Sequence, residues 1–148
     1  MEQARSVLAQ VAEYADLLFC SQRDLDAFLG VTQEGFFDVY QGARVLVVRE
    51  RAILSADQHA MQAAVYTKDG RAADIERTFC VKERIGGGDA FTAGFLHSWL
   101  NDSGDLAAAL GTATACFTLK HTVDGDVLAV TEAELNAYKA TASKDVMR

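Results

Sequence analysis

The sequence predicts an α/β layer sandwich, in which helices cover both faces of a sheet that is at least partly parallel. Two short apolar runs, at residues 15–20 and 44–49, have the length of buried strands, and the second contains three valines. Helical patterns flank both runs, as expected for parallel strands that are covered on each side. An Asp-Gly pair between two further strand-like runs adds a hairpin.

The N-terminal part is expected to contain three helices. The first spans residues 2–13, where apolar residues recur at helical spacing. The second follows Ser21, which has the spacing of a capping box with Asp24, and it ends at Gly30. The third covers residues 32–42.

The second half begins with the hairpin and ends in helices. Residues 62–67 and 73–81 are predicted to pair as antiparallel strands. Three glycines then open an amphipathic helix over residues 86–100. A helix over residues 105–119 is apolar nearly all round and is therefore expected to be buried, and a last helix covers residues 131–138.

The number of core strands is low for such a fold. Open α/β sheets commonly have about five or six strands, whereas only two runs here have the pattern of parallel core strands. We therefore expect one domain of 148 residues that corresponds to the later half of a larger sheet.

Composition argues against several kinds of partner. The net charge of −7 disfavours nucleic acid or an anionic membrane held by bulk charge. No apolar run reaches the roughly 18 residues of a membrane span, and the N-terminus has no signal-peptide pattern. Cys20, Cys80 and Cys116 lack CxxC spacing, so we predict buried free thiols in a reducing, cytoplasmic compartment. No cluster of His, Cys and carboxylate residues has metal-ligand spacing.

The stretch Gly86-Gly87-Gly88-Asp89 is the main candidate for chemistry. Glycines let backbone amides approach a ligand closely, and the start of the following helix directs unpaired N–H groups and its positive dipole end at one point. The residues alone leave two interpretations open. The stretch is either an anion-binding loop with Asp89 as a base, or a flexible turn with Asp89 as a helix-start residue.

The segment Gly86-Gly87-Gly88-Asp89-Ala90-Phe91, followed by Gly94, resembles the C-terminal signature of the ribokinase-like (PfkB) sugar kinases. The segments Val47-Val48-Arg49-Glu50, Arg84-Ile85 and Leu119-Lys120-His121-Thr122 are similar to the 2-keto-3-deoxygluconate kinase branch of that family. The similarity extends through nearly the whole chain.

This resemblance implies that residues 1–148 form one partial ribokinase-like domain, the C-terminal half of a three-layer α/β/α sandwich. It contains the nucleotide-binding half and the catalytic loop. Family members are considerably longer, and their N-terminal half, which supplies most of the sugar contacts, has no counterpart in this sequence. The sequence also departs from the family at Glu83-Arg84, where Asp-Thr is common.

The resemblance also implies a mechanism of phosphoryl transfer from ATP, with Mg²⁺ entering on the phosphates of the nucleotide and no protein side chain assigned to the metal. Asp89 is expected to take the proton from the attacking sugar hydroxyl. The amides of Gly86, Gly87 and Gly88 are expected to form the anion hole.

Three basic side chains complete the expected site: Arg49 and His121 at the nucleotide, and Arg84 at the carboxylate of a sugar acid. Each has a plain alternative. Both arginines are also compatible with solvated surface residues, and His121 with a polar loop residue. His59 and His97 are expected at the surface.

Two functions remain in view. The first is a carbohydrate kinase that transfers the γ-phosphate of ATP to a sugar-acid hydroxyl, with 2-keto-3-deoxygluconate as the acceptor. The second is a truncated, non-catalytic kinase remnant that folds or oligomerises without phosphotransfer. In either case the missing strands lead us to expect a homo-oligomer or a separate N-terminal half as a partner.

Overall fold

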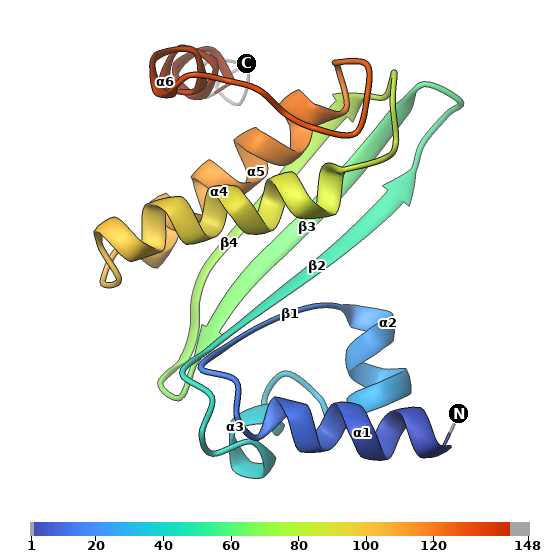
Figure 1. The fold of residues 1–148 in the computed structure, drawn as a ribbon, viewed down its shortest axis with the longest axis vertical. Helices are drawn as coiled ribbons and strands as arrows, with labels where there is room; N and C mark the ends of the chain where they lie inside the picture. Colours follow the sequence, from blue (N-terminus) through green and yellow to red (C-terminus); the bar gives the residue numbers. More distant parts are fainter. Residues whose placement is uncertain (1, 143–148) are drawn as a thin grey trace.

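The structure is a computed structural model that describes residues 2–142, and these form a four-stranded sheet with helices on its two faces (Figure 1). The strand order is β1-β2-β3-β4. β1 and β2 pair in parallel, whereas β2 with β3 and β3 with β4 pair antiparallel. The predicted parallel pair and the hairpin are confirmed. The strands are β1 (Leu17–Ser21), β2 (Val45–Ile53), β3 (Gln58–Thr67) and β4 (Gly70–Cys80).

A second hairpin joins β2 to β3, and the sequence analysis did not predict it. The backbone N–H groups of Leu54 and Ser55 both donate to the Gln58 carbonyl, each at 2.9 Å. The Ser55 hydroxyl accepts from the Gln58 N–H at 3.1 Å and donates to Asp57 at 2.8 Å. This turn contains no glycine, and hydrogen bonds of the Ser55 side chain help to stabilise it. It therefore lacks the usual sequence signature of a hairpin turn.

The N-terminal helices are α1 (Glu2–Ala12), α2 (Gln22–Asp24), the π-helical turn η1 (Leu25–Leu29) and α3 (Phe36–Val39). The predicted capping box is present, since the Ser21 hydroxyl accepts from the Asp24 N–H at 3.1 Å and Asp24 accepts from the Ser21 N–H at 3.2 Å. The predicted helix over residues 32–42 is wrong in extent. Thr32 accepts from the Gly35 N–H at 3.2 Å and closes a turn there, so only α3 is helical.

Alternate residues of β2 pack into different cores, which confirms the three-layer arrangement. Val45 and Val47 face α4 (Gly87–Asn101) and α5 (Leu106–Lys120). Leu46 and Val48 face the layer that contains α1 and α3. The last helix, α6 (Glu132–Ala142), packs against α4 and α5, on the same side of the sheet as these two helices (Figure 1).

Helix α5 is largely buried, as predicted, and α4 packs against it through its apolar face. Phe91 and Phe95 are almost fully buried in the core. A Cβ at Gly94 would lie 2.8 Å from the Cys116 sulfur, so the two helices approach as closely as a glycine permits. The Asp105 side chain caps α5 by accepting from the Ala108 N–H at 2.8 Å.

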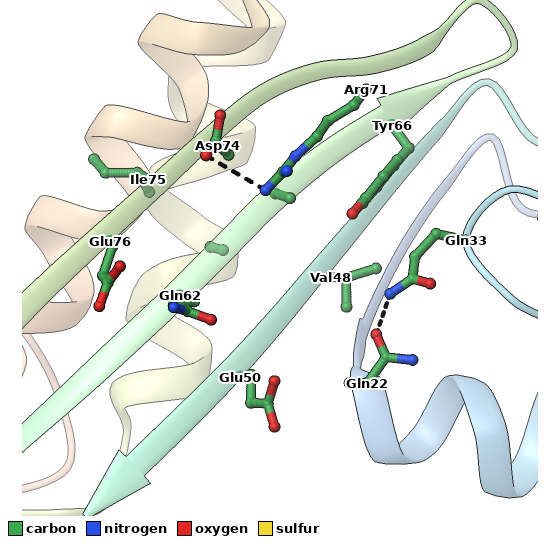
Figure 2. Close-up of a pocket in the computed structure, with 12 residues that line it drawn as sticks. Gln22, Gln33, Val48, Glu50, Gln62, Tyr66, Arg71, Asp74, Ile75 and Glu76 are labelled. Carbon is green, nitrogen blue, oxygen red and sulfur yellow. Dashed lines mark hydrogen bonds and ion pairs between the residues drawn. The ribbon is translucent and has the colours of Figure 1, made fainter. Parts of the chain in front are cut away.

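No helix within residues 2–142 covers the opposite face of β3 and β4. A groove of about 210 Å³ lies there, and Figure 2 shows the polar side chains that line it. Arg71 pairs with Asp74 at 3.4 Å, and Gln33 donates to Gln22. This groove is on the face of the sheet away from α4 and from residues Gly86–Asp89, which we call the glycine loop.

Two expectations about single side chains are wrong. His59 is only 2% exposed, because it lies on the inner face of β3 beside Phe79. Cys80 is exposed and Cys20 is half-buried, so Cys116 alone of the three free thiols is buried. Burial, followed by the charge of Asp24, raises the pKa of Cys20 to about 12. No helix in residues 2–142 has the length and apolar character needed to cross a membrane.

Candidate functional site

The glycine loop lies where the parallel pairing of β1 with β2 ends, near Ser21 and Arg49. Gly86 has a φ of 80° and stands before the first turn of α4. The first helical hydrogen bond runs from the Ala90 N–H to the Gly86 carbonyl at 2.9 Å, and no side chain of the described residues caps the helix. The amides of Gly87, Gly88 and Asp89 are therefore available to an anion, together with the positive end of the helix dipole.

Each of the three glycines is adjacent to a different basic side chain. A Cβ at Gly86 would overlap the Asp126 carbonyl and lie 3.1 Å from Cε of Lys120. A Cβ at Gly87 would overlap the imidazole of His121.

A Cβ at Gly88 would lie at an ordinary contact distance of 3.5 Å from a guanidinium nitrogen of Arg49. Glycine is thus required sterically at the first two positions and leaves room for a ligand at the third.

Arg49 is held under the loop by aromatic rings. Its guanidinium carbon lies 5.2 Å from the centroid of Phe91 and 5.0 Å from that of Phe117, which is cation–π geometry. One guanidinium nitrogen, Nη1, is buried and has no partner among the described residues. Burial lowers the pKa of Arg49 and so does the neighbouring Arg51, whereas Asp24 and Asp89 act in the opposite direction. A half-buried guanidinium with one buried, unused donor nitrogen is suited to binding an anion.

His121 lies in the turn immediately after α5, and its side chain is buried there, with 1% exposed. Its Nδ1 lies 2.7 Å from the Phe117 carbonyl, and its Nε2 is buried without a partner among the described residues. Burial lowers the pKa of His121, partly offset by the bond to Phe117 and reinforced by Arg51, Lys120 and His59. The neutral ring therefore donates from Nδ1 and presents Nε2 as an acceptor.

These groups line one cleft of about 430 Å³. Four arginines contribute to it, although the chain as a whole carries a charge of −7. None of the ion pairs within residues 2–142 involves any of them. The cleft is therefore a local concentration of positive charge, with Glu50 as the acidic residue in its lining. Its lining consists of Ser21, Gln22, Arg23, Arg49, Glu50, Arg51, Arg84, Gly87, Gly88, Phe117 and His121.

Asp89 lines an adjoining cavity of about 250 Å³ that shares Arg49 and Gly88 with the cleft. Its side chain is exposed, in the first turn of α4. A carboxylate at this position stands next to the free amides and is accessible to a second ligand. Asp24 lines the same cavity. No group of three or more His, Cys, Asp or Glu residues in the described part of the chain could hold a metal ion.

The structure brings the expected site residues together and adds others that sequence reasoning missed. Arg49, Arg84 and His121 meet at the glycine loop, although Arg84 is itself exposed. Arg51 was missed because the strand was expected to end at residue 49. Since β2 continues, Arg51 lies on the same face as Arg49, two residues further along. Lys120 was missed because it was assigned to a polar loop rather than to the end of α5.

Comparison with solved structures identifies the fold. A PfkB family carbohydrate kinase from Listeria grayi matches with a TM-score of 0.81 and 27% identity, over 94% of this chain and 45% of that chain. A protein from Enterococcus faecalis, provisionally assigned as a 2-keto-3-deoxygluconate kinase, matches with a TM-score of 0.80 and 25% identity, over 97% and 46%. The chain forms one half of a ribokinase-like fold.

The 2-dehydro-3-deoxygluconokinase of Thermotoga maritima shares this ribokinase-like fold, with a TM-score of 0.80 at 20% identity over 94% of this chain and 45% of that chain. The resemblance to PfkB carbohydrate kinases that the glycine motif indicated is thereby confirmed. The ribokinase-like half spans less than half the length of each structure that it matches. No protein-family model and no curated protein matches the sequence.

Proposed function

We propose that this ribokinase-like half belongs to an ATP-dependent kinase that phosphorylates a hydroxyl group of a sugar acid, 2-keto-3-deoxygluconate. One observation carries the proposal. The free amides at the start of α4 lie between an exposed Asp89 and a half-buried Arg49 that has no ion-pair partner among the described residues. This arrangement supplies an anion site and a base side by side, as phosphoryl transfer to an alcohol requires.

In this mechanism the hydroxyl oxygen of the sugar attacks the γ-phosphorus of ATP, Asp89 accepts the hydroxyl proton, and ADP leaves. The amides of Gly86, Gly87 and Gly88 stabilise the charge that develops on the transferred group. Magnesium bound to ATP would neutralise part of the negative charge on the phosphates of the nucleotide. Arg49 binds the nucleotide phosphates through its unused donor.

His121 and Arg84 are assigned to the two ligands. The unpaired Nε2 of His121 is an acceptor and fits a donor such as an exocyclic amino group of the nucleotide base. Arg84 is exposed on the rim of the same cleft, where it can pair with the carboxylate of a sugar acid. The similarity to proteins named as 2-keto-3-deoxygluconate kinases favours this acceptor.

A coupled assay of ADP release tests the proposal. The chain is supplied with ATP, Mg²⁺ and 2-keto-3-deoxygluconate, and a neutral sugar serves as the control acceptor. We expect ADP release that depends on the sugar acid. Equal rates with the neutral sugar would contradict the role of Arg84, and absence of ATP binding by calorimetry would contradict the assignment of the glycine loop.

The second candidate is a non-catalytic half that folds or oligomerises and transfers no phosphate. It is favoured by the coverage of less than half of the matching kinases. ATP binding without ADP release in the assay above would support it.

A further inference from the structure

Lys120 is a buried cation with few partners. It is the last residue of α5 and is 0% exposed. Its ammonium donates to the Val123 carbonyl at 3.4 Å, and none of the ion pairs in residues 2–142 involves it. A buried ammonium without a paired carboxylate is costly, so its retention at this position calls for a reason.

The Lys120 side chain lies beside the glycine loop at Gly86 and does not line the ligand cleft. Cε of Lys120, which carries the ammonium, would be 3.1 Å from a Cβ at Gly86, and the Asp126 carbonyl closes the same space. Lys120 is absent from the cleft lining, in contrast to its neighbour His121. Its charge is therefore fixed close to the amides but does not reach a ligand directly.

Two loops meet around this charge. The N–H groups of Lys82 and Glu83 both donate to the His121 carbonyl, at 2.7 and 3.2 Å. The Glu83 carboxylate accepts from the Arg84 and Ile85 N–H groups at 2.7 and 3.1 Å. The backbone bonds to Ile85 and Arg84 are the main causes that lower the pKa of Glu83, and Lys120 adds to them. The segment that leads into the glycine loop is thus fastened to the residues that follow α5.

We propose that Lys120 is a positioning residue of the anion hole, an internal cation that adds fixed positive charge beside the glycine amides, where the segment 83–88 meets the segment 120–126. This inference rests on the proposed function, because it assumes that the loop binds phosphate. A fixed charge several ångströms from an anion strengthens binding without contact, since the surrounding protein screens it less than water does.

The proposal predicts that removing the charge of Lys120 changes anion binding without lowering the stability of the fold. Replacing a buried ion by an apolar side chain of similar volume is often neutral or stabilising. Lys120→Met is therefore expected to retain or raise the unfolding temperature and to weaken anion binding. A purely structural lysine would instead affect both properties together.

The test measures pyrophosphate binding to the 148-residue chain by calorimetry at constant ionic strength, with thermal unfolding in parallel. Lys120→Met should bind pyrophosphate at least about tenfold more weakly, the order expected for loss of a nearby unit charge. The matched control is Lys82→Met, which removes the same charge from an exposed side chain that pairs with Asp124 at 2.7 Å. It should change the affinity by no more than about twofold, because exposed charges are screened.

A chemical rescue completes the test. Lys120→Ala leaves a cavity of the size of the lost side chain, and methylammonium chloride should restore pyrophosphate binding to this variant, whereas sodium chloride should not. Wild-type affinity in Lys120→Met would overturn this inference alone. Loss of fold in both variants, or joint loss of binding and stability without rescue, would assign Lys120 to the fold and overturn it too. Failure of the unmodified chain to bind pyrophosphate would overturn the proposed function along with it.

Discussion

At the scale of single residues, the site is defined by what surrounds three backbone amides. Arg49 is stabilised by two aromatic rings and remains unneutralised. His121 is kept neutral by burial, which outweighs the opposing effect of its hydrogen bond to the Phe117 carbonyl. These environments follow from contacts across the fold, and each leads to a measurable consequence.

Asp89→Asn is expected to lower turnover by about 10²-fold or more, because an amide cannot accept the hydroxyl proton. Stability should change little, since the side chain is exposed. The measurement is steady-state ADP release in a form of the protein that transfers phosphate. Asp69→Asn, in the exposed hairpin turn, is the control and should retain full activity. Retention of more than about a tenth of turnover by Asp89→Asn would exclude a general base at this position.

Gly87→Val is expected to abolish binding of ATP and pyrophosphate, because any side chain there would overlap the imidazole of His121. Gly111→Val is the control, since a Cβ at that helical position meets nothing within 4 Å. Calorimetric titration of both variants provides the comparison. Equal affinity in the two would place the phosphate site elsewhere.

The buried histidines predict a specific dependence of stability on pH. Burial lowers the pKa of both His59 and His121 below the usual 6.5, so the unfolded chain binds protons that the folded chain does not. The free energy of unfolding should therefore be constant above about pH 6.5 and fall as the pH decreases below it, by up to about 1.4 kcal/mol per pH unit for one histidine.

Urea unfolding at pH 7.5 and pH 5.5 measures this effect. His121→Phe should reduce the difference between the two conditions. His97→Gln is the control, because the His97 side chain is 54% exposed. An unchanged difference in His121→Phe would show that His121 is not the group that titrates.

At the scale of elements, the contact between α4 and α5 sets the position of the glycine loop. Gly94 allows the approach of the two helices, and the first turn of α4 is carried along with it. The register of this helix pair is thus linked to the geometry of the anion site.

Gly94→Ala tests that link. The new methyl group would lie 2.8 Å from the Cys116 sulfur and 3.0 Å from the Thr112 carbonyl, so we expect a loss of about 1–3 kcal/mol in the free energy of unfolding. Gly111→Ala, on α5 and without such contacts, should be neutral or stabilising by roughly 0.5–1 kcal/mol. Chemical denaturation of both variants gives the comparison. Equal stabilities would mean that the helices move apart without cost.

At the scale of the whole molecule, the sheet ends in an open edge. β1 is the terminal strand and pairs with β2 alone among the described strands. Apolar side chains are exposed on the adjacent α1 and just after it, with Val7 54%, Val11 59% and Tyr14 88% exposed. Open strand edges and apolar patches are surfaces for association.

We therefore expect the 148-residue chain to self-associate, or to bind a separate chain that carries the other half of the fold. Light scattering at several concentrations measures the association. Val11→Lys should weaken it. Val127→Lys should not, because Val127 is 72% exposed in the segment between α5 and α6, and that segment lies at the opposite end of the molecule from α1 (Figure 1). A compact monomer at every concentration would contradict the expectation.

The sequence by itself determined those features that depend on neighbouring residues. The Ser21–Asp24 capping box and the Asp69-Gly70 turn act within a few residues, and their signals were read correctly. The helix after Gly86 was also predicted, since its apolar stripe and glycine start are local patterns. Where a local signal was weak, as in the glycine-free turn after β2, the prediction failed.

Only the tertiary structure decided which side chains meet at the glycine loop. Arg49 comes from β2, Lys120 and His121 from the end of α5, and the amides from α4. Their convergence depends on the register of β2 and on the packing of α5 beneath α4, and sequence spacing encodes neither. The burial of polar side chains was also decided by the tertiary structure. His59 and Lys120 have polar side chains, and only the placement of their strand and helix against the core removed them from water.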